Sequence, residues 1–231
     1  MAGNSYERVL IVGAGAGLSA SLARLFTREG MQVALAARNP GKLSALCAET
    51  GARAYECDAV KPEDVQRLYA RVESDMGVPD AVVYNASARA RGAVADLAAR
   101  DVMRAIEVSA FGGFLVAQEA VRRMLPKGRG AILFTGASAS VKGYAQSAPF
   151  AMGKFALRGL AQSMARELAP QGIHVAHFVI DGGIAQVGRV PSGPDALLDP
   201  DAIAMNYLHV MRQPRSAWTW EMELRPWVEK F

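Results

Sequence analysis

Short apolar runs alternate along this chain with longer segments whose apolar residues recur at helical spacing. The apolar runs predict strands at residues 9–12, 32–36, 53–57, 81–84, 131–134 and 174–180. The longer segments predict helices at residues 17–29, 42–49, 62–76, 101–125, 149–169 and 200–212. Glycine, the residue that most often ends a helix, closely follows five of them. This alternation predicts an α/β fold with a doubly wound parallel sheet.

The C-terminal segment, residues 216–231, departs from this pattern. It contains the three tryptophans of the chain, Trp218, Trp220 and Trp227. Apolar and polar side chains alternate over residues 218–224, which predicts a last strand at the edge of the sheet. We expect the tryptophans to cover the core or a subunit contact. Because no linker or repeat interrupts the chain, a single domain is predicted over residues 1–231.

Composition narrows the class of protein. The net charge is +4, but the basic residues are scattered and have no aromatic side chains between them, so we expect no nucleic-acid partner. No apolar run has the length of a membrane span and no signal-type block opens the chain, so we expect no membrane association. Cys47 and Cys57 have neither metal-ligand nor disulfide spacing, which favours a cytoplasmic protein without a bound metal.

A glycine-rich turn follows the first predicted strand. Gly13, Gly15 and Gly17 lie there with Ala16, and Leu18 continues into the first predicted helix. Small residues let the backbone approach a pyrophosphate, while the start of a helix offers free N–H groups and the positive end of its dipole. The turn therefore predicts a nucleotide site, with a tight turn that binds nothing as the alternative.

The spacing of the glycines indicates which nucleotide-binding family this turn resembles. The common dinucleotide fingerprint fits from Gly15, with Ala20 at its sixth place. The spacing Gly13-x-x-x-Gly17 agrees better than that fingerprint with a turn that directly follows a strand ending at Val12. It resembles the cofactor turn of the short-chain dehydrogenase/reductase family, with Ser19 where that family usually has a third glycine.

Later motifs extend the resemblance over about residues 8–185. Asn85 and Ala86 follow the fourth predicted strand, as the family's Asn-Asn-Ala-Gly does. Asp58 follows the third, at the place of the family's aspartate that meets the adenine, although an ordinary cap aspartate is an alternative. The resemblance implies a Rossmann-type domain and adds these residues to the cofactor site: Asp58, Ala59, Asn85, Ala86, Lys154 and Ile184.

The end of the second predicted strand indicates which dinucleotide binds. An acidic residue there accepts a hydrogen bond from the ribose 2′-hydroxyl of NAD, whereas an arginine accommodates the 2′-phosphate of NADP. This chain has Arg38 and Asn39 with no acid beside them. We therefore predict NADP(H), with a solvent-facing Arg38 as the alternative.

The resemblance implies an altered catalytic site. Phe150 lies at the position of the family's proton-transferring tyrosine, four residues before an intact Lys154. Counting back the usual interval places Ala137 at the position of the carbonyl-orienting serine, with Ser138 adjacent. Ser109 lies at the position of the asparagine that completes the family's proton relay. Because a phenyl ring neither donates nor accepts a proton, the proton has to come from elsewhere.

Other side chains offer alternatives. Tyr144 follows the fifth predicted strand, where it either donates the proton or packs against the substrate. His177 lies in an apolar run, which is typical of a hydrogen-bonded core histidine. Arg89 and Arg91 either reach the pocket mouth and favour an anionic substrate or are solvated loop residues.

Together these features predict an NADP(H)-dependent oxidoreductase that reduces a small organic substrate by a non-standard proton path through Lys154, Tyr144 or Ser138. Two alternatives stay open: a non-catalytic NADP(H)-binding sensor or partner protein, and a non-redox enzyme on the same fold. The resemblance also implies a homodimer or homotetramer formed through the helical segments 101–125 and 149–169.

Overall fold

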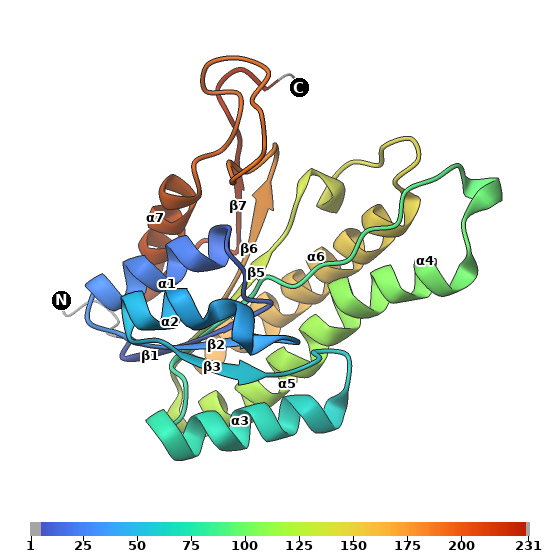
Figure 1. The fold of residues 1–231 in the computed structure, drawn as a ribbon. Helices are drawn as coiled ribbons and strands as arrows, with labels where there is room; N and C mark the ends of the chain where they lie inside the picture. The colour runs from blue at the N-terminus through green and yellow to red at the C-terminus, as the bar shows by residue number, and fades with distance from the viewer. Residues whose placement is uncertain (1–5, 230–231) are drawn as a thin grey trace.

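The computed structural model describes residues 6–229, which form a seven-stranded, wholly parallel sheet between helices (Figure 1). The strands are β1 (Arg8–Val12), β2 (Gln32–Ala37), β3 (Arg53–Glu56), β4 (Ala81–Tyr84), β5 (Gly130–Thr135), β6 (Ile173–Ile180) and β7 (Glu221–Leu224). Their order is β3-β2-β1-β4-β5-β6-β7. The predicted Rossmann-type, doubly wound sheet is confirmed.

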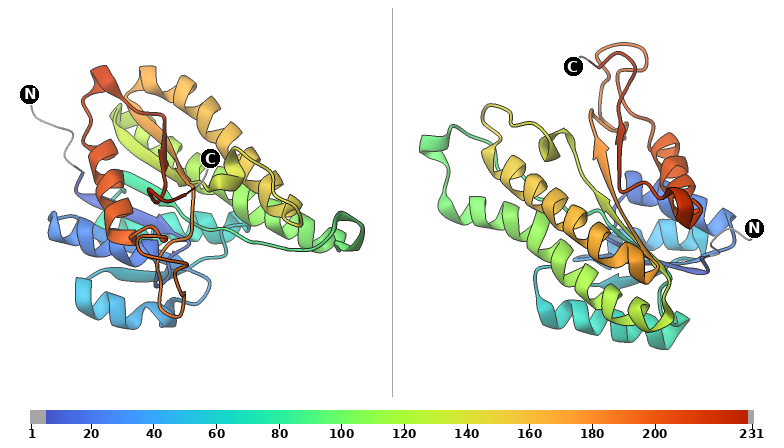
Figure 2. Two further views of the ribbon diagram at one scale, coloured as in Figure 1. Left: turned by 90° about the horizontal axis from the view of Figure 1, so that it is seen from above. Right: turned by 180° about the vertical axis from the view of Figure 1, so that it is seen from behind.

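Helices cover both faces of this sheet (Figure 2). They are α1 (Leu18–Arg28), α2 (Ser44–Thr50), α3 (Pro62–Met76), α4 (Ala99–Ile106), α5 (Gly112–Met124), α6 (Ala148–Leu168) and α7 (Pro200–Met211). Successive strand residues point to opposite faces, so each strand supplies two apolar clusters. Val9 and Ile11 pack towards α1, α2 and α7, whereas Leu10 and Val12 pack towards α3, α5 and α6.

Two predicted helices differ from the structure. The segment predicted as helix 101–125 begins at Ala99 and passes through a π-helical turn, Glu107–Phe111, before α5. The Tyr84 hydroxyl donates a hydrogen bond to the carbonyl of Val108 inside this turn. The helix predicted from residue 42 is divided into a 3-10 turn, Pro40–Leu43, and α2.

The predicted C-terminal edge strand is β7, which pairs with β6. Two of the tryptophans pack against nearby elements: Trp218 stacks on His174 with 4.6 Å between ring centres, and Arg158 lies 5.6 Å from the ring centre of Trp220. Trp227 is largely exposed. Residues 1–5 of the predicted domain and residues 230–231 of the predicted tail lie outside the described residues.

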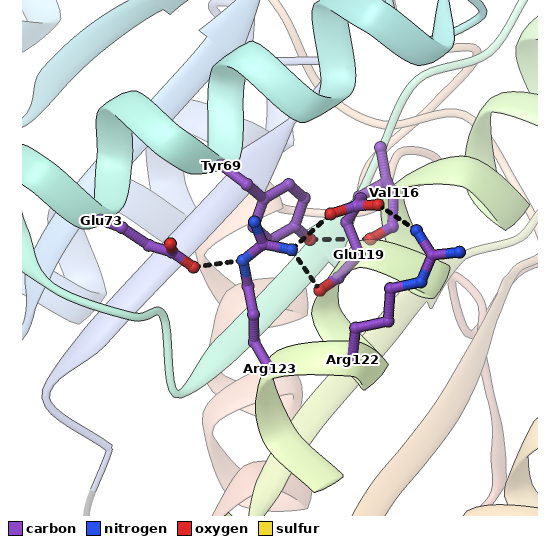
Figure 3. Close-up of polar contacts among 6 residues, drawn as sticks. All are labelled: Tyr69, Glu73, Val116, Glu119, Arg122 and Arg123. Atoms are coloured by element: carbon purple, nitrogen blue, oxygen red, sulfur yellow. Dashed lines mark hydrogen bonds and ion pairs between the residues drawn. The ribbon is translucent and has the colours of Figure 1, made fainter. Parts of the chain in front are cut away.

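A partly buried network joins α3 to α5 (Figure 3). The Tyr69 hydroxyl donates to the Val116 carbonyl at 2.7 Å, and the Arg123 guanidinium lies 4.8 Å from the Tyr69 ring centre. Arg123 also forms ion pairs with Glu73 of α3 and Glu119 of α5. The network therefore fixes α5, which continues directly from the π turn, against α3.

The turn after β1 depends on the absence of a side chain at Gly13. Its φ is +86°, and a Cβ there would lie 2.3 Å from the backbone nitrogen of Ala86. The backbone segments that follow β1 and β4 are therefore in close contact where these two strands end side by side. At Gly15, in contrast, a Cβ would meet nothing within 4 Å and φ is not in the positive range.

We predict that Gly13→Ala destabilises the fold and that Gly15→Ala, the matched control, does not. The unfavourable φ and the contact with Ala86 together should cost at least about 2 kcal/mol, which is about 4–8 °C in Tm for a domain of this size. Thermal denaturation followed by circular dichroism measures both variants. An unchanged Tm for Gly13→Ala would show that the turn can relax away from Ala86.

Candidate functional site

The carboxyl ends of β1 and β4 lie at the point where the strand order reverses, the usual ligand position in an open α/β sheet. A cavity of about 630 Å³ opens there. Eight of the predicted cofactor residues line it: Gly13, Gly15, Ala16, Arg38, Asp58, Ala59, Asn85 and Ala86. These eight residues come from the turns and strand ends that follow β1, β2, β3 and β4.

Backbone and side-chain hydrogen bonds fix the glycine turn. The backbone N–H of Gly13 donates to the Ala36 carbonyl at 3.0 Å. The Ser19 hydroxyl donates to the Gly13 carbonyl at 3.3 Å and accepts from the Asn85 side-chain amide at 2.8 Å. Ser19 therefore links the start of α1 to the end of β4, a role that the motif alone did not indicate.

The lining of this cavity fits a dinucleotide. No atom lies within 4 Å of a Cβ built on Gly15 or Gly17, so the turn leaves open space in front of the α1 N-terminus, where a pyrophosphate binds favourably. Arg38 and Lys42 line the β2 side, and within residues 6–229 neither side chain forms a hydrogen bond or ion pair. These two cations suit an anionic group of a ligand.

Four other predicted cofactor residues, Gly17, Leu18, Lys154 and Ile184, do not line this cavity, and Asp58 has a partner that the motif did not predict. Asp58 forms an ion pair with Arg104 of α4 at 3.3 Å. Leu18 is buried in the core beneath the turn, and Ile184 forms a β-bridge with Leu198. Gly17 caps α1. Lys42 and Arg104 were missed because each lies on a helical segment that only the fold brings to the cavity.

A second cavity, of about 370 Å³, contains most of the predicted catalytic positions. Ala137, Ser138, Tyr144 and Phe150 line it together. The first two follow β5 and Phe150 lies in the first turn of α6. These four residues, from the loop after β5 and the start of α6, therefore surround one space, which Arg89, Arg91 and Arg189 also line.

Lys154 lies behind this cavity. Its side chain is almost fully buried, and its ammonium group donates to the Thr135 carbonyl at 2.7 Å. The amine nitrogen lies 5.9 Å from the Phe150 ring centre. Burial, followed by the Arg89 charge, lowers the pKa of Lys154 to about 7. This amine can therefore exchange a proton near neutral pH.

The side chain of Ser138 is fixed by a hydrogen bond, whereas that of Tyr144 is half exposed. Ser138 hydrogen-bonds to the buried Asp181, whose carboxylate also accepts from Lys142 at 2.9 Å. Burial acts to raise the pKa of Asp181, but the Ser138 and Lys142 hydrogen bonds outweigh it and the pKa falls below its usual value. Tyr144 is 49% exposed in its loop, so it faces the cavity with little packing to fix it.

Ser109, the residue at the predicted asparagine position, lies in the π turn. Its hydroxyl is buried and has no hydrogen-bond partner among the described residues. It packs against Gly153, where a Cβ would approach the Ser109 Cβ to 2.7 Å. This contact places Ser109 beside the residue that precedes Lys154.

A chain of polar contacts that the sequence did not indicate supports the loop after β5. The Ala137 N–H donates to Ser140 Oγ at 3.1 Å, and Ser140 Oγ lies 3.3 Å from His177 Nε2. His177 Nδ1 lies 3.1 Å from Glu221, which Arg158 binds through two hydrogen bonds.

His177 is a structural residue in this chain of contacts. Burial lowers its pKa to about 4, so the ring is neutral, with Nδ1 donating to the Glu221 carboxylate and Nε2 accepting from Ser140. Ser140 and His177 are both fully buried. No substrate reaches them, and the core-histidine interpretation holds.

Comparisons with known proteins agree with this geometry. The family model of short chain dehydrogenases matches residues 7–185. A solved short-chain dehydrogenase from Rhodopseudomonas palustris is 35% identical, with a TM-score of 0.83, and the match covers 96% of this chain and 99% of that one. A solved short-chain type dehydrogenase/reductase from Mycobacterium marinum is 27% identical, with a TM-score of 0.85 over 95% of this chain and 94% of that one.

Among named enzymes, the mitochondrial borneol dehydrogenase of Lavandula x intermedia is 30% identical over 72% of this chain, but the match spans only 65% of the length of that enzyme. Within residues 6–229, no helix has the length and apolar character needed to cross a bilayer. The glycine turn, the strand order and the match over residues 7–185 lead to one conclusion: the chain belongs to the short-chain dehydrogenase family of oxidoreductases, which bind a nicotinamide cofactor.

Proposed function

We propose that this chain is an NADP(H)-dependent reductase of a small organic carbonyl compound that uses a non-standard proton path. The observation that carries the proposal is the pairing of the two cavities. Asn85 and Ala86 line the first, and Arg89 and Arg91, a few residues later, line the second. One short segment after β4 therefore borders both the cofactor and the substrate sides of the site.

The role proposed for each residue follows from its burial and hydrogen bonding. NADPH, when bound, supplies the hydride. Gly13, Gly15 and Gly17 admit its pyrophosphate, and Arg38 binds the 2′-phosphate. Lys154, fixed on the Thr135 carbonyl, holds the nicotinamide end from the protein interior and is one source of the proton.

Within the substrate cavity, Ser138 and Tyr144 are the other proposed proton sources. Ser138 is the better placed to orient a carbonyl because Asp181 fixes its hydroxyl. Phe150, at the position that the resemblance assigns to tyrosine, contributes an apolar wall under Arg89, whose guanidinium carbon lies 4.1 Å from the ring centre.

A non-catalytic NADP(H)-binding sensor is the second candidate. It is favoured by the same Phe150 wall, since a phenyl ring has no hydroxyl to transfer a proton, and by the burial of Lys154. A non-redox enzyme on this fold is the third. Ketone reduction by the unmodified protein, measured beside the double variant Phe150→Tyr with Ala137→Ser, distinguishes the reductase from these alternatives.

We also propose a homo-oligomer, a dimer or tetramer, in the cytoplasm. Large apolar side chains are exposed on α4, the π turn, α5 and α6, namely Met103, Phe111, Phe114, Met152 and Phe155. Covering them against a second copy would remove this apolar surface from water. The free thiols Cys47 and Cys57 suit a reducing compartment.

Arg38→Ala should abolish a preference for NADPH over NADH. The charge-assisted contact with the 2′-phosphate predicts a preference of roughly 1.5–3 kcal/mol, or about one to two orders of magnitude in Kd. Fluorescence titration with both nucleotides measures it. Arg28→Ala, at the exposed end of α1, is the matched control. Equal affinities in the unmodified protein would remove the NADP assignment.

The oligomer prediction is tested with light scattering after size-exclusion chromatography. The double variant Met152→Arg with Phe155→Arg should be a monomer, because it places two charges in the apolar face of α6. Met205→Arg, at an exposed apolar position on α7, should leave the mass unchanged. A monomeric unmodified protein contradicts the proposal.

Phe150→Tyr combined with Ala137→Ser should create reduction of activated ketones well above the parent rate. The new phenol would lie near Lys154 and Arg89, whose charges lower its pKa, and a positioned acid contributes about 10²–10⁴ in rate. The loss of NADPH absorbance over a ketone panel measures the gain, and each single variant is a control. A folded, NADPH-binding double variant without activity favours the sensor.

A further inference from the structure

Three arginines line the substrate cavity from two separate segments. Arg89 and Arg91 come from the loop after β4, and Arg189 comes from the loop between β6 and α7. Burial lowers the pKa of Arg89, and the charges of Arg91 and Arg189 lower it further, so these two arginines act on Arg89 electrostatically. The fold therefore brings like charges together around one space, which costs free energy unless an anion joins them.

No carboxylate neutralises this cluster in the described part of the chain. None of the residues that line the cavity is an aspartate or glutamate. Within residues 6–229, Arg89 and Arg91 form no hydrogen bond or ion pair, and Arg189 makes one long hydrogen bond, 3.5 Å, to the Ile184 carbonyl. Several arginines elsewhere are paired, as Arg24 is with Glu49 and Arg158 with Glu221.

Two of the guanidinium groups are placed by packing. Arg89 lies over the Phe150 ring at 4.1 Å, which orients its plane while leaving its N–H groups unbonded. Arg189 lies against Gly183, where a Cβ would come within 2.3 Å of its Nη2. The N-terminus of α6, next to Ser147 and Phe150 of the same cavity, adds the positive end of a helix dipole.

We propose that this cluster binds an oxoanion of the substrate, so that the compound reduced carries a carboxylate or phosphate group beside its carbonyl-bearing carbon chain. The inference rests on the proposed reductase function. The cofactor phosphates have their own cations, Arg38 and Lys42, in the other cavity. Ala137, Ala139 and Phe150 provide an apolar wall for a short carbon chain.

Matched pairs of ketones test the proposal on the full chain with NADPH. The first pair is 3-oxobutanoate and its methyl ester, and the second is dihydroxyacetone phosphate and dihydroxyacetone. The charged partner of at least one pair should have a kcat/KM about tenfold higher or more, and Arg91→Gln should remove most of that advantage. Arg166→Gln, on the exposed face of α6, is the control. The pair that shows the preference identifies the anion as carboxylate or phosphate.

Calorimetry separates this inference from the proposed function. With NADP⁺ present, 3-oxobutanoate or inorganic phosphate should bind, and the binding should weaken about tenfold in Arg91→Gln but not in Arg166→Gln. If no ketone is reduced but this binding is observed, the anion site stands and the reductase function fails. If neutral ketones are reduced as well as charged ones and neither anion binds, the anion site is wrong and the reductase function stands.

Discussion

The contact between the backbones of Gly13 and Ala86 sets the position of everything at the carboxyl edge of the sheet. At this point the turn after β1 touches the chain leaving β4, and the bonds from Asn85 to Ser19 and from Ser19 to Gly13 hold the contact in place. The opening of the cofactor cavity and the path of the loop that carries Arg89 both follow from it. A side chain at residue 13 would separate the two elements that the site requires together.

The two halves of the site differ in electrostatics. The cofactor side contains cations and one carboxylate, Asp58, which is paired with Arg104. The second cavity concentrates positive charge, with Arg91 and Arg189 in its lining and Arg89 over the Phe150 ring. In the proposed reaction the substrate oxygen gains negative charge as the hydride arrives, and fixed positive charge in a space of low dielectric stabilises that oxygen. In this proposal, the field takes over part of the role that the resemblance assigns to a tyrosine hydroxyl.

The sequence predicted the strands well because parallel strands covered on both faces are continuous apolar runs, and β7 was found from its alternation. The π turn at 107–111 has no comparable local signal, since contacts with Tyr84 from another element accompany it. Lys42 and Arg104 joined the cofactor cavity only through tertiary packing. The contacts from Ser140 to His177 and Glu221 connect residues far apart in the chain, which motif spacing does not reveal.

Those contacts have a consequence for how the protein is made. Glu221 of β7 fixes His177, and His177 contacts Ser140 in the loop that forms the substrate wall. During synthesis a chain emerges from its N-terminus, so β7 is the last strand of this sheet to leave the ribosome. The wall of the substrate cavity therefore gains its last support only after β7 has left the ribosome and docked on β6.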